Sequence, residues 1–256
     1  MAVDTETGFY LGSELPGTVF MVLLFAAAAL LALCVWRTED RGMTTLHGNR
    51  LLEGVAAALG LLVLGSSIGP LGEALRLHAS PDAAINRLPR WLLLSEHTLG
   101  VISGAVLVLL ALWCISGAHR SSLQGSLALI PVVWQSLFTV DRFFGFWQVL
   151  TNADQLIETM FLVSASMFLL AHAGCLSGLA PQRRRAIAYS LLTALFGFVL
   201  VAGQLSAVAV LGSNVVGPST LRMAVIACTS LYALLFAAAV AHTPELDLPS
   251  AAPVEK

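Results

Sequence analysis

The sequence predicts an all-α polytopic membrane protein, a bundle of seven transmembrane helices with its N-terminus outside the cell and its C-terminus in the cytoplasm. Composition is the first reason: 57% of the residues are hydrophobic and 11% are charged, whereas a soluble domain carries about 25% charged residues. The second reason is that seven apolar runs reach the roughly 20 residues that a helix needs to cross the hydrocarbon core. We therefore expect a multi-pass protein of a bacterial plasma membrane, with the lipid bilayer as its main surroundings.

The seven spans are expected within one domain, residues 1–242, near residues 17–36, 51–69, 92–117, 125–145, 156–178, 187–211 and 221–241. The first span is expected to be a permanent helix. Asp4, Glu6 and Glu14 precede it without a basic residue, which is the reverse of a secretory signal. Residues 243–256 contain three prolines and no apolar run, so a disordered cytoplasmic tail is expected there.

The segment after the second span predicts two short helices lying on the outer surface. Residues 71–78 place leucines against charged and polar side chains, a pattern typical of an interfacial helix. Ser80, Pro81 and Asp82 follow, and this order of cap, first-turn proline and acid predicts a helix start.

Small residues and proline indicate how some spans pack. Gly100 and Gly104 form a G-x-x-x-G in the third span, and Gly197 and Gly203 lie in the sixth. Such residues permit close helix approach, and they are a weak signal for a homodimer. Pro131 predicts a kink in the fourth span.

The basic residues set the expected orientation, because cytoplasmic loops are enriched in Lys and Arg. With the N-terminus outside, eight of the 13 basic residues fall inside and five outside. The run at 183–185, beside the sixth span, is the strongest single indication.

The stretch "VDRFFGFWQVLTNADQLIETM", residues 140–160, combines aromatic and charged side chains between two apolar runs. One interpretation is a plain surface turn, because aromatic residues favour the headgroup level and Asn152 is a helix-capping residue. A second interpretation rests on depth: Asp141 and Arg142 lie within the end of the fourth span, and Glu158 lies one turn inside the fifth. Charges facing lipid cost about 2.5–3.5 kcal/mol, so these side chains should turn toward the bundle and pair.

Charged residues at other outer helix ends extend this second interpretation to an outward-facing polar mouth. Arg142 and Arg222 are each expected to meet one of the carboxylates, and Asp154 shares a helix face with Glu158. The alternative is that the same pairs only hold helices together. The candidate ligand-binding residues are Glu96, His97, Asp141, Arg142, Asp154, Glu158 and Arg222.

Histidines and cysteines give no cofactor signature, and we expect neither a metal nor another cofactor. His47, His119, His172 and His242 fall toward the cytoplasmic side, but no two are spaced i, i+3 or i+4. His172 is the one expected to be buried and hydrogen-bonded. The four cysteines lie singly in apolar runs, as packing residues do. A retinal pigment is excluded, because its Schiff base needs a lysine within a span and the only lysine is Lys256.

Two stretches resemble a set of uncharacterised multispanning membrane proteins from anaerobic Gram-positive bacteria. They are "TETGFYLGSELPG" before the first span and "IPVVWQSLFTVDRFFGFWQVLTNADQLIETMFLVSASMFLLAHAGCLSG" across the fourth and fifth spans. Similar proteins have a Thr-Gly pair before the first helix, and an acidic turn followed by a long helix with a histidine near its end. The matching positions are Thr7, Gly8, Asp154, Glu158 and His172. The resemblance implies the seven-span architecture and no particular activity.

Three hypotheses for function remain open on the sequence. The first is a binding or transport protein whose mouth accepts a small polar solute. The second is a non-catalytic sensor or assembly subunit that meets a partner membrane protein. The third, a membrane enzyme with a histidine or carboxylate site, is the least favoured, because no catalytic motif is present. No basic block is long enough to suggest nucleic acid.

Overall fold

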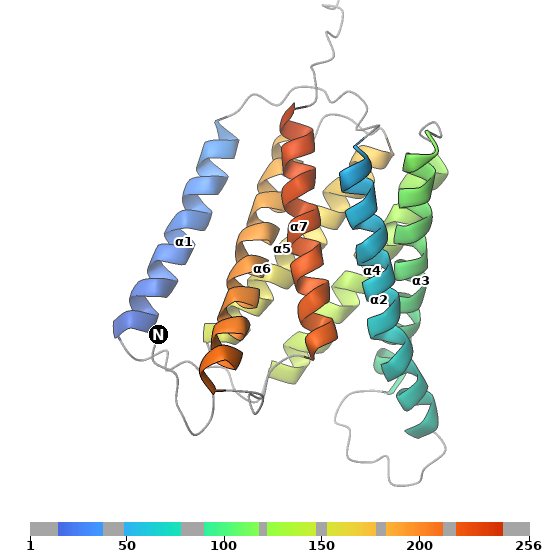
Figure 1. Ribbon diagram of the computed structural model, residues 1–256, viewed down its shortest axis with the longest axis horizontal. Helices are drawn as coiled ribbons and strands as arrows, with labels where there is room; N and C mark the ends of the chain where they lie inside the picture. Colours follow the sequence, from blue (N-terminus) through green and yellow to red (C-terminus); the bar gives the residue numbers. More distant parts are fainter. Residues whose placement is uncertain are drawn as a thin grey trace, which may run out of the picture.

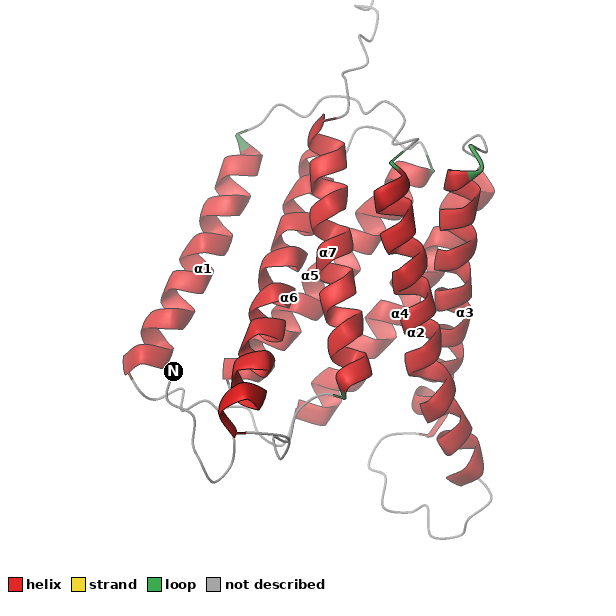
Figure 2. Cartoon of the chain, in the orientation of Figure 1, coloured by secondary structure: helices red, strands yellow, loops and turns green. Residues whose placement is uncertain are grey.

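The computed structural model describes residues 15–37, 49–77, 90–117, 122–146, 153–177, 183–211 and 219–242, and each of these segments contains one long helix (Figure 2). All seven helices are long and apolar enough to cross a membrane, so the seven predicted spans are confirmed as helices. Their bounds are α1 (Leu15–Trp36), α2 (Arg50–Leu77), α3 (Arg90–Ile115), α4 (Ser122–Phe146), α5 (Ala153–Leu176), α6 (Arg183–Leu211) and α7 (Thr220–His242).

Successive helices alternate in direction, so the bundle has two distinct ends (Figure 1). We call the end at which α1, α3, α5 and α7 begin the charged end. The opposite end, at which α2, α4 and α6 begin, is called the cavity end. Because the helices alternate in direction, α3, α5 and α7 begin at the same end of the bundle. Residues that are far apart in the sequence can therefore lie close together at that end.

Two glycines bring the backbones of α2 and α3 close together. A Cβ on Gly104 would lie 2.6 Å from the carbonyl oxygen of Gly60, and a Cβ on Gly60 would lie 2.7 Å from the carbonyl oxygen of Gly104. Only hydrogen fits at either position. The G-x-x-x-G of α3 thus serves packing within the chain: Gly104 faces α2, and Gly100 faces Ser67 of α2 and Trp134 of α4.

Aromatic side chains fill the space between α5 and α7. Phe168 is fully buried and Phe236 is 1% exposed, and their rings meet edge to face with centroids 5.5 Å apart. The rings of His172 and Tyr232 pack in the same group, 5.6 Å apart. Such edge-to-face pairs are favourable beyond the area they bury, and they fix how α5 sits against α7.

The helix α1 is peripheral and packs along α6 (Figure 1). Leu24 and Ala28 are buried against a second core that includes Phe161 and Phe196. Much of its remaining surface is large and apolar, with Val22, Leu23 and others exposed. This is expected for a helix whose outer face contacts lipid tails.

The prediction of a separate surface helix at residues 71–78 is wrong. Residues 71–77 continue α2, which passes through Pro70 without ending. Proline is tolerated inside membrane helices because nearby groups satisfy the freed carbonyl. Likewise α4 runs on across Pro131. The second predicted helix start at Ser80, the tail 243–256, His47 and His119 lie outside the described residues.

Candidate functional site

A group of charged side chains from four helices gathers at the charged end. We define this charged cluster as Glu96 and His97 of α3, Asp141 and Arg142 of α4, Glu158 of α5 and Arg222 of α7. Alternating helix direction explains the grouping, since α3, α5 and α7 begin at the end where α4 finishes. Six of the seven predicted site residues belong to it. For the seventh, Asp154, the structure describes only the backbone, in the first turn of α5.

An ion pair links α7 to α5 within the cluster. The Nη2 group of Arg222 donates a hydrogen bond to Oε1 of Glu158, and the two side chains are 17% and 20% exposed. Among the carboxylates that the sequence offered as partners of Arg222, the fold thus brings Glu158 into direct contact. The pair is largely removed from water, where such contacts are screened less than on an open surface.

Phe138 of α4 lies between the two arginines of the cluster. The guanidinium carbons of Arg142 and Arg222 are each 5.4 Å from the centre of its ring. The ring also stacks on Trp134, with centroids 5.9 Å apart. A π face attracts cations more strongly where water is excluded, so Phe138 helps hold two like charges near each other. Sequence reasoning did not single out Phe138, because it lies in the apolar part of the fourth span.

Two carboxyl groups meet beside Arg142. Glu96 is 4% exposed and lies close enough to Asp141 and Arg142 to interact with both. Nδ1 of His97 lies 3.9 Å from Oε1 of Glu96. Adjacent carboxylates repel, and a nearby guanidinium or a shared proton relieves that repulsion. The cluster therefore brings three carboxyl groups and two guanidinium groups together at one end of the bundle.

Four atoms of the charged cluster are buried and make no hydrogen bond to the described part of the protein: Glu96 Oε2, Asp141 Oδ1, Arg142 Nε and Arg222 Nε. Buried polar groups are nearly always hydrogen-bonded. A hollow of about 40 Å³ lies next to Glu158 and Arg222 and is also lined by Gln204 of α6. One water needs about 10–15 Å³, so roughly three waters, or a few solute atoms, would fit. The cluster thus has two hydrogen-bond donors and two acceptors available for a ligand or for water. The hollow lies beside Arg222.

One aromatic residue of the 140–160 stretch agrees with the surface-turn interpretation. Phe143 is 52% exposed, as a residue at the headgroup level would be. Asp141 and Arg142 are each only partly exposed and engage the bundle. The same helix turn thus carries an outward aromatic and inward charges.

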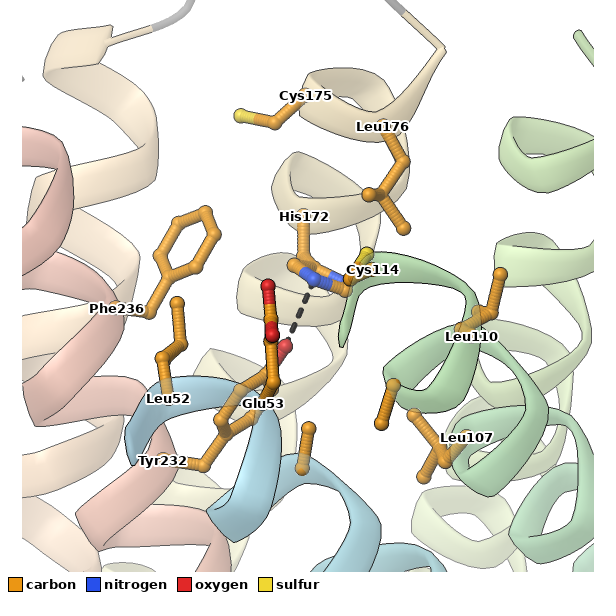
Figure 3. A pocket seen from close by; sticks show the side chains of 12 residues that line it. Leu52, Glu53, Leu107, Leu110, Cys114, His172, Cys175, Leu176, Tyr232 and Phe236 are labelled. Atoms are coloured by element: carbon orange, nitrogen blue, oxygen red, sulfur yellow. Dashed lines mark hydrogen bonds between the residues drawn. The ribbon is translucent and has the colours of Figure 1, made fainter. Parts of the chain in front are cut away.

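A second polar group lies near the cavity end and surrounds a cavity of about 50 Å³ (Figure 3). The hydroxyl of Tyr232 and Nε2 of His172 are 2.8 Å apart and share a hydrogen bond. The carboxylate of Glu53, on a residue that is 7% exposed, reaches the same space from α2 (Figure 3). Cys114 and Cys175 complete the polar lining. We call this the histidine cavity.

Sequence reasoning anticipated one member of the histidine cavity. His172 was expected to be hydrogen-bonded, and it is. Glu53 and Tyr232 were missed. A usable signal existed for Glu53, since it is an acid just inside the apolar run 51–69, and acids at membrane depth are functional candidates. The signal for Tyr232 was weaker, because one tyrosine in an apolar span is common.

Within the described segments, no group of three or more His, Cys, Asp or Glu side chains could hold a metal ion. Compared with protein-family models, with curated proteins and with solved structures, the chain shows no match.

Proposed function

We propose that this integral membrane protein binds a small polar solute at the charged cluster and carries it across the bilayer, with the charged end facing outward. One observation carries the proposal: four buried hydrogen-bonding atoms of the cluster make no hydrogen bond to the described residues, and a hollow lies next to Arg222. Leaving a buried polar group unpaired costs about 1–3 kcal/mol, and more where the group is charged. A bound solute would remove that cost.

The chemistry of the four atoms defines the solute class. Two are arginine Nε donors and two are carboxyl oxygens. A solute that satisfies both kinds carries an acceptor, such as a carboxylate, and a donor, such as an ammonium. We therefore infer a small zwitterion. The hollow holds only a few atoms, so a larger solute would require the helices of the charged end to separate.

A second candidate function is a sensor or assembly subunit in which the charges only lock the helices. The Arg222–Glu158 pair favours it, because that contact is complete without a solute. The two functions differ in what they expect of Arg142, whose Nε makes no hydrogen bond within the described segments. A locking role needs no ligand there, whereas a binding role does.

Thermal unfolding of the purified protein in detergent tests the proposal. Glycine serves as the zwitterion, and acetate, methylammonium and glycerol serve as anion, cation and neutral solute. Glycine at ten times its Kd should stabilise the protein by about 1.4 kcal/mol, and the other three should act more weakly. Arg142→Gln and Asp141→Asn should remove the glycine effect.

The matched control is Glu73→Gln, which changes an exposed carboxylate on α2 and should leave the glycine effect intact. Equal shifts with all four solutes, or a glycine shift that survives in Arg142→Gln, would contradict binding at the cluster. Uptake of labelled glycine into proteoliposomes then separates transport from binding alone.

A further inference from the structure

We propose that Glu96 of α3 and Asp141 of α4 share one exchangeable proton, and that the charged cluster holds this proton together with the bound solute. The shared proton does not depend on the proposed function, whereas its joint binding with a solute rests on that function. The proton comes from solution and bonds to a carboxylate oxygen, so no other bond breaks and no electron is transferred.

The two carboxyl groups come from neighbouring helices and lie against each other. The side chains of Glu96 and Asp141 are within hydrogen-bonding reach of one another, at the end where α3 begins and α4 finishes (Figure 1). An ionised carboxylate has only acceptor oxygens, so two ionised groups cannot form a hydrogen bond and instead repel. One proton between them turns the repulsion into a short, charge-assisted hydrogen bond.

Burial strengthens the repulsion that the proton removes. Glu96 is 4% exposed, and its Oε2 atom, like Oδ1 of Asp141, is buried and receives no hydrogen bond from the described residues. Like charges interact more strongly where water is excluded. A proton supplies the missing donor without requiring a cavity between the two side chains.

The neighbouring cations of the cluster do not balance both carboxylates. Arg222 hydrogen-bonds Glu158, which leaves Arg142 as the guanidinium nearest to being free for the pair of Glu96 and Asp141. One guanidinium balances one carboxylate, so among the described side chains the second carboxylate has no cation of its own. One bound proton makes the group neutral.

The other titratable groups near the pair do not take the place of this proton. Nδ1 of His97 lies 3.9 Å from Oε1 of Glu96, which is too long for a hydrogen bond. Glu73 and Arg76 of α2, the helix that packs along α3, are exposed. The side chains of Arg90 and Asp154 are not among those described.

The same proton keeps the cluster neutral when a solute is bound. A zwitterion brings no net charge, so the balance is unchanged if the proton stays. The shared proton uses one acceptor position on each carboxyl group, whereas a carboxylate offers about four, so acceptors remain for an ammonium group. Net charge at membrane depth is costly, which favours holding the proton and the zwitterion together over exchanging one for the other.

Infrared difference spectroscopy of the full-length protein in proteoliposomes tests the shared proton without any solute. A pH titration should show a carboxylic-acid carbonyl band, equivalent to one group per protein, in a step distinct from that of the exposed carboxyl groups. Glu96→Gln and Asp141→Asn should each abolish the whole step, because a shared proton needs both groups. Glu73→Gln, at an exposed position of α2, should leave it unchanged.

His97→Gln separates the carboxyl pair from the imidazole as the holder of the proton, and the step should survive in this variant. A step that is absent from the wild-type protein, that persists in part in either carboxyl variant, or that disappears in His97→Gln would overturn the shared proton. The wild-type titration keeps the proposal open to refutation even if a carboxyl variant does not fold.

Saturating glycine, added at a pH at which the band is present, tests the joint binding. The band should persist, and calorimetry in two buffers of different ionisation enthalpy should detect no net proton release. Loss of the band with one proton released per glycine would show exchange and overturn joint binding. If glycine gives no thermal shift while the titration step is present, the proposed function fails and the shared proton stands.

Discussion

Arg222 of α7 hydrogen-bonds Glu158 of α5 at the charged end, and Tyr232 of α7 hydrogen-bonds His172 of α5 toward the cavity end. The same two helices are therefore joined by polar contacts at two levels of the bundle, the second of them within their aromatic group. Polar contacts between membrane helices are specific in direction, whereas apolar packing alone permits sliding and rotation. The register of α5 against α7 is consequently fixed at two points, and each can be tested separately.

The Arg222–Glu158 contact should contribute measurably to stability. Glu158→Gln removes one charge and leaves a largely buried guanidinium uncompensated. We expect a loss of about 1–3 kcal/mol, below the 3–5 kcal/mol seen for fully buried pairs, since both side chains retain some exposure. Thermal unfolding in detergent measures it.

Glu73→Gln is the control for this pair and should have little effect, because Glu73 is exposed. The double variant Glu158→Gln/Arg222→Gln should cost less than the sum of the two single changes. Strict additivity would show that the two side chains do not interact in solution.

Phe138 should contribute to the stability of the protein because its ring contacts two guanidinium groups. Phe138→Leu keeps an apolar side chain but removes the π face shared by Arg142 and Arg222. A cation–π contact is worth about 0.5–2 kcal/mol, so the melting temperature should fall. Phe198→Leu on α6, where the side chain is 40% exposed, is the matched control. A loss as large in the control as in Phe138→Leu would assign the effect to general packing.

The glycine contact between α2 and α3 should tolerate no side chain. Gly104→Ala places a methyl group 2.6 Å from the Gly60 carbonyl and 2.7 Å from the Leu64 amide. Because both are backbone atoms, the helices must move apart, and we expect a loss of about 1–3 kcal/mol. Gly65→Ala meets nothing within 4 Å and should be neutral or slightly stabilising, because alanine favours the helix. Unfolding of the two variants side by side gives the comparison, and equal stability would refute the contact.

Cysteine labelling tests the predicted orientation. In a background with all four native cysteines replaced, Tyr10→Cys and Asn86→Cys should react with an impermeant thiol reagent applied to intact cells. Arg185→Cys, at an exposed position at the start of α6, should react only after lysis. The expectation follows from the excess of basic residues on the cytoplasmic side. The opposite pattern would place the charged end in the cytoplasm.

The sequence by itself determined the secondary structure and the membrane class. Each helix is recognisable from its own run of apolar residues, because the cost of placing polar backbone in lipid is met locally by helical hydrogen bonds. The exception is residues 71–77, where the alternation of leucines with charged side chains suggested a separate surface helix but the chain continues α2 through Pro70. Local sequence also placed Glu158 and Arg222 at one level, because alternating spans bring their ends together.

Only the tertiary structure decided which of these groups touch. Four carboxylates were possible partners of Arg222, and the rotation of α5 about its axis selected Glu158. Rotation depends on side-chain packing among α5, α6 and α7, which no single span encodes. The histidine cavity was hidden for the same reason: Glu53, His172 and Tyr232 belong to three spans, and each residue taken alone resembles an ordinary interfacial or core side chain. Their meeting in one cavity is a property of the packed bundle, because only packing determines which faces of separate helices are opposed.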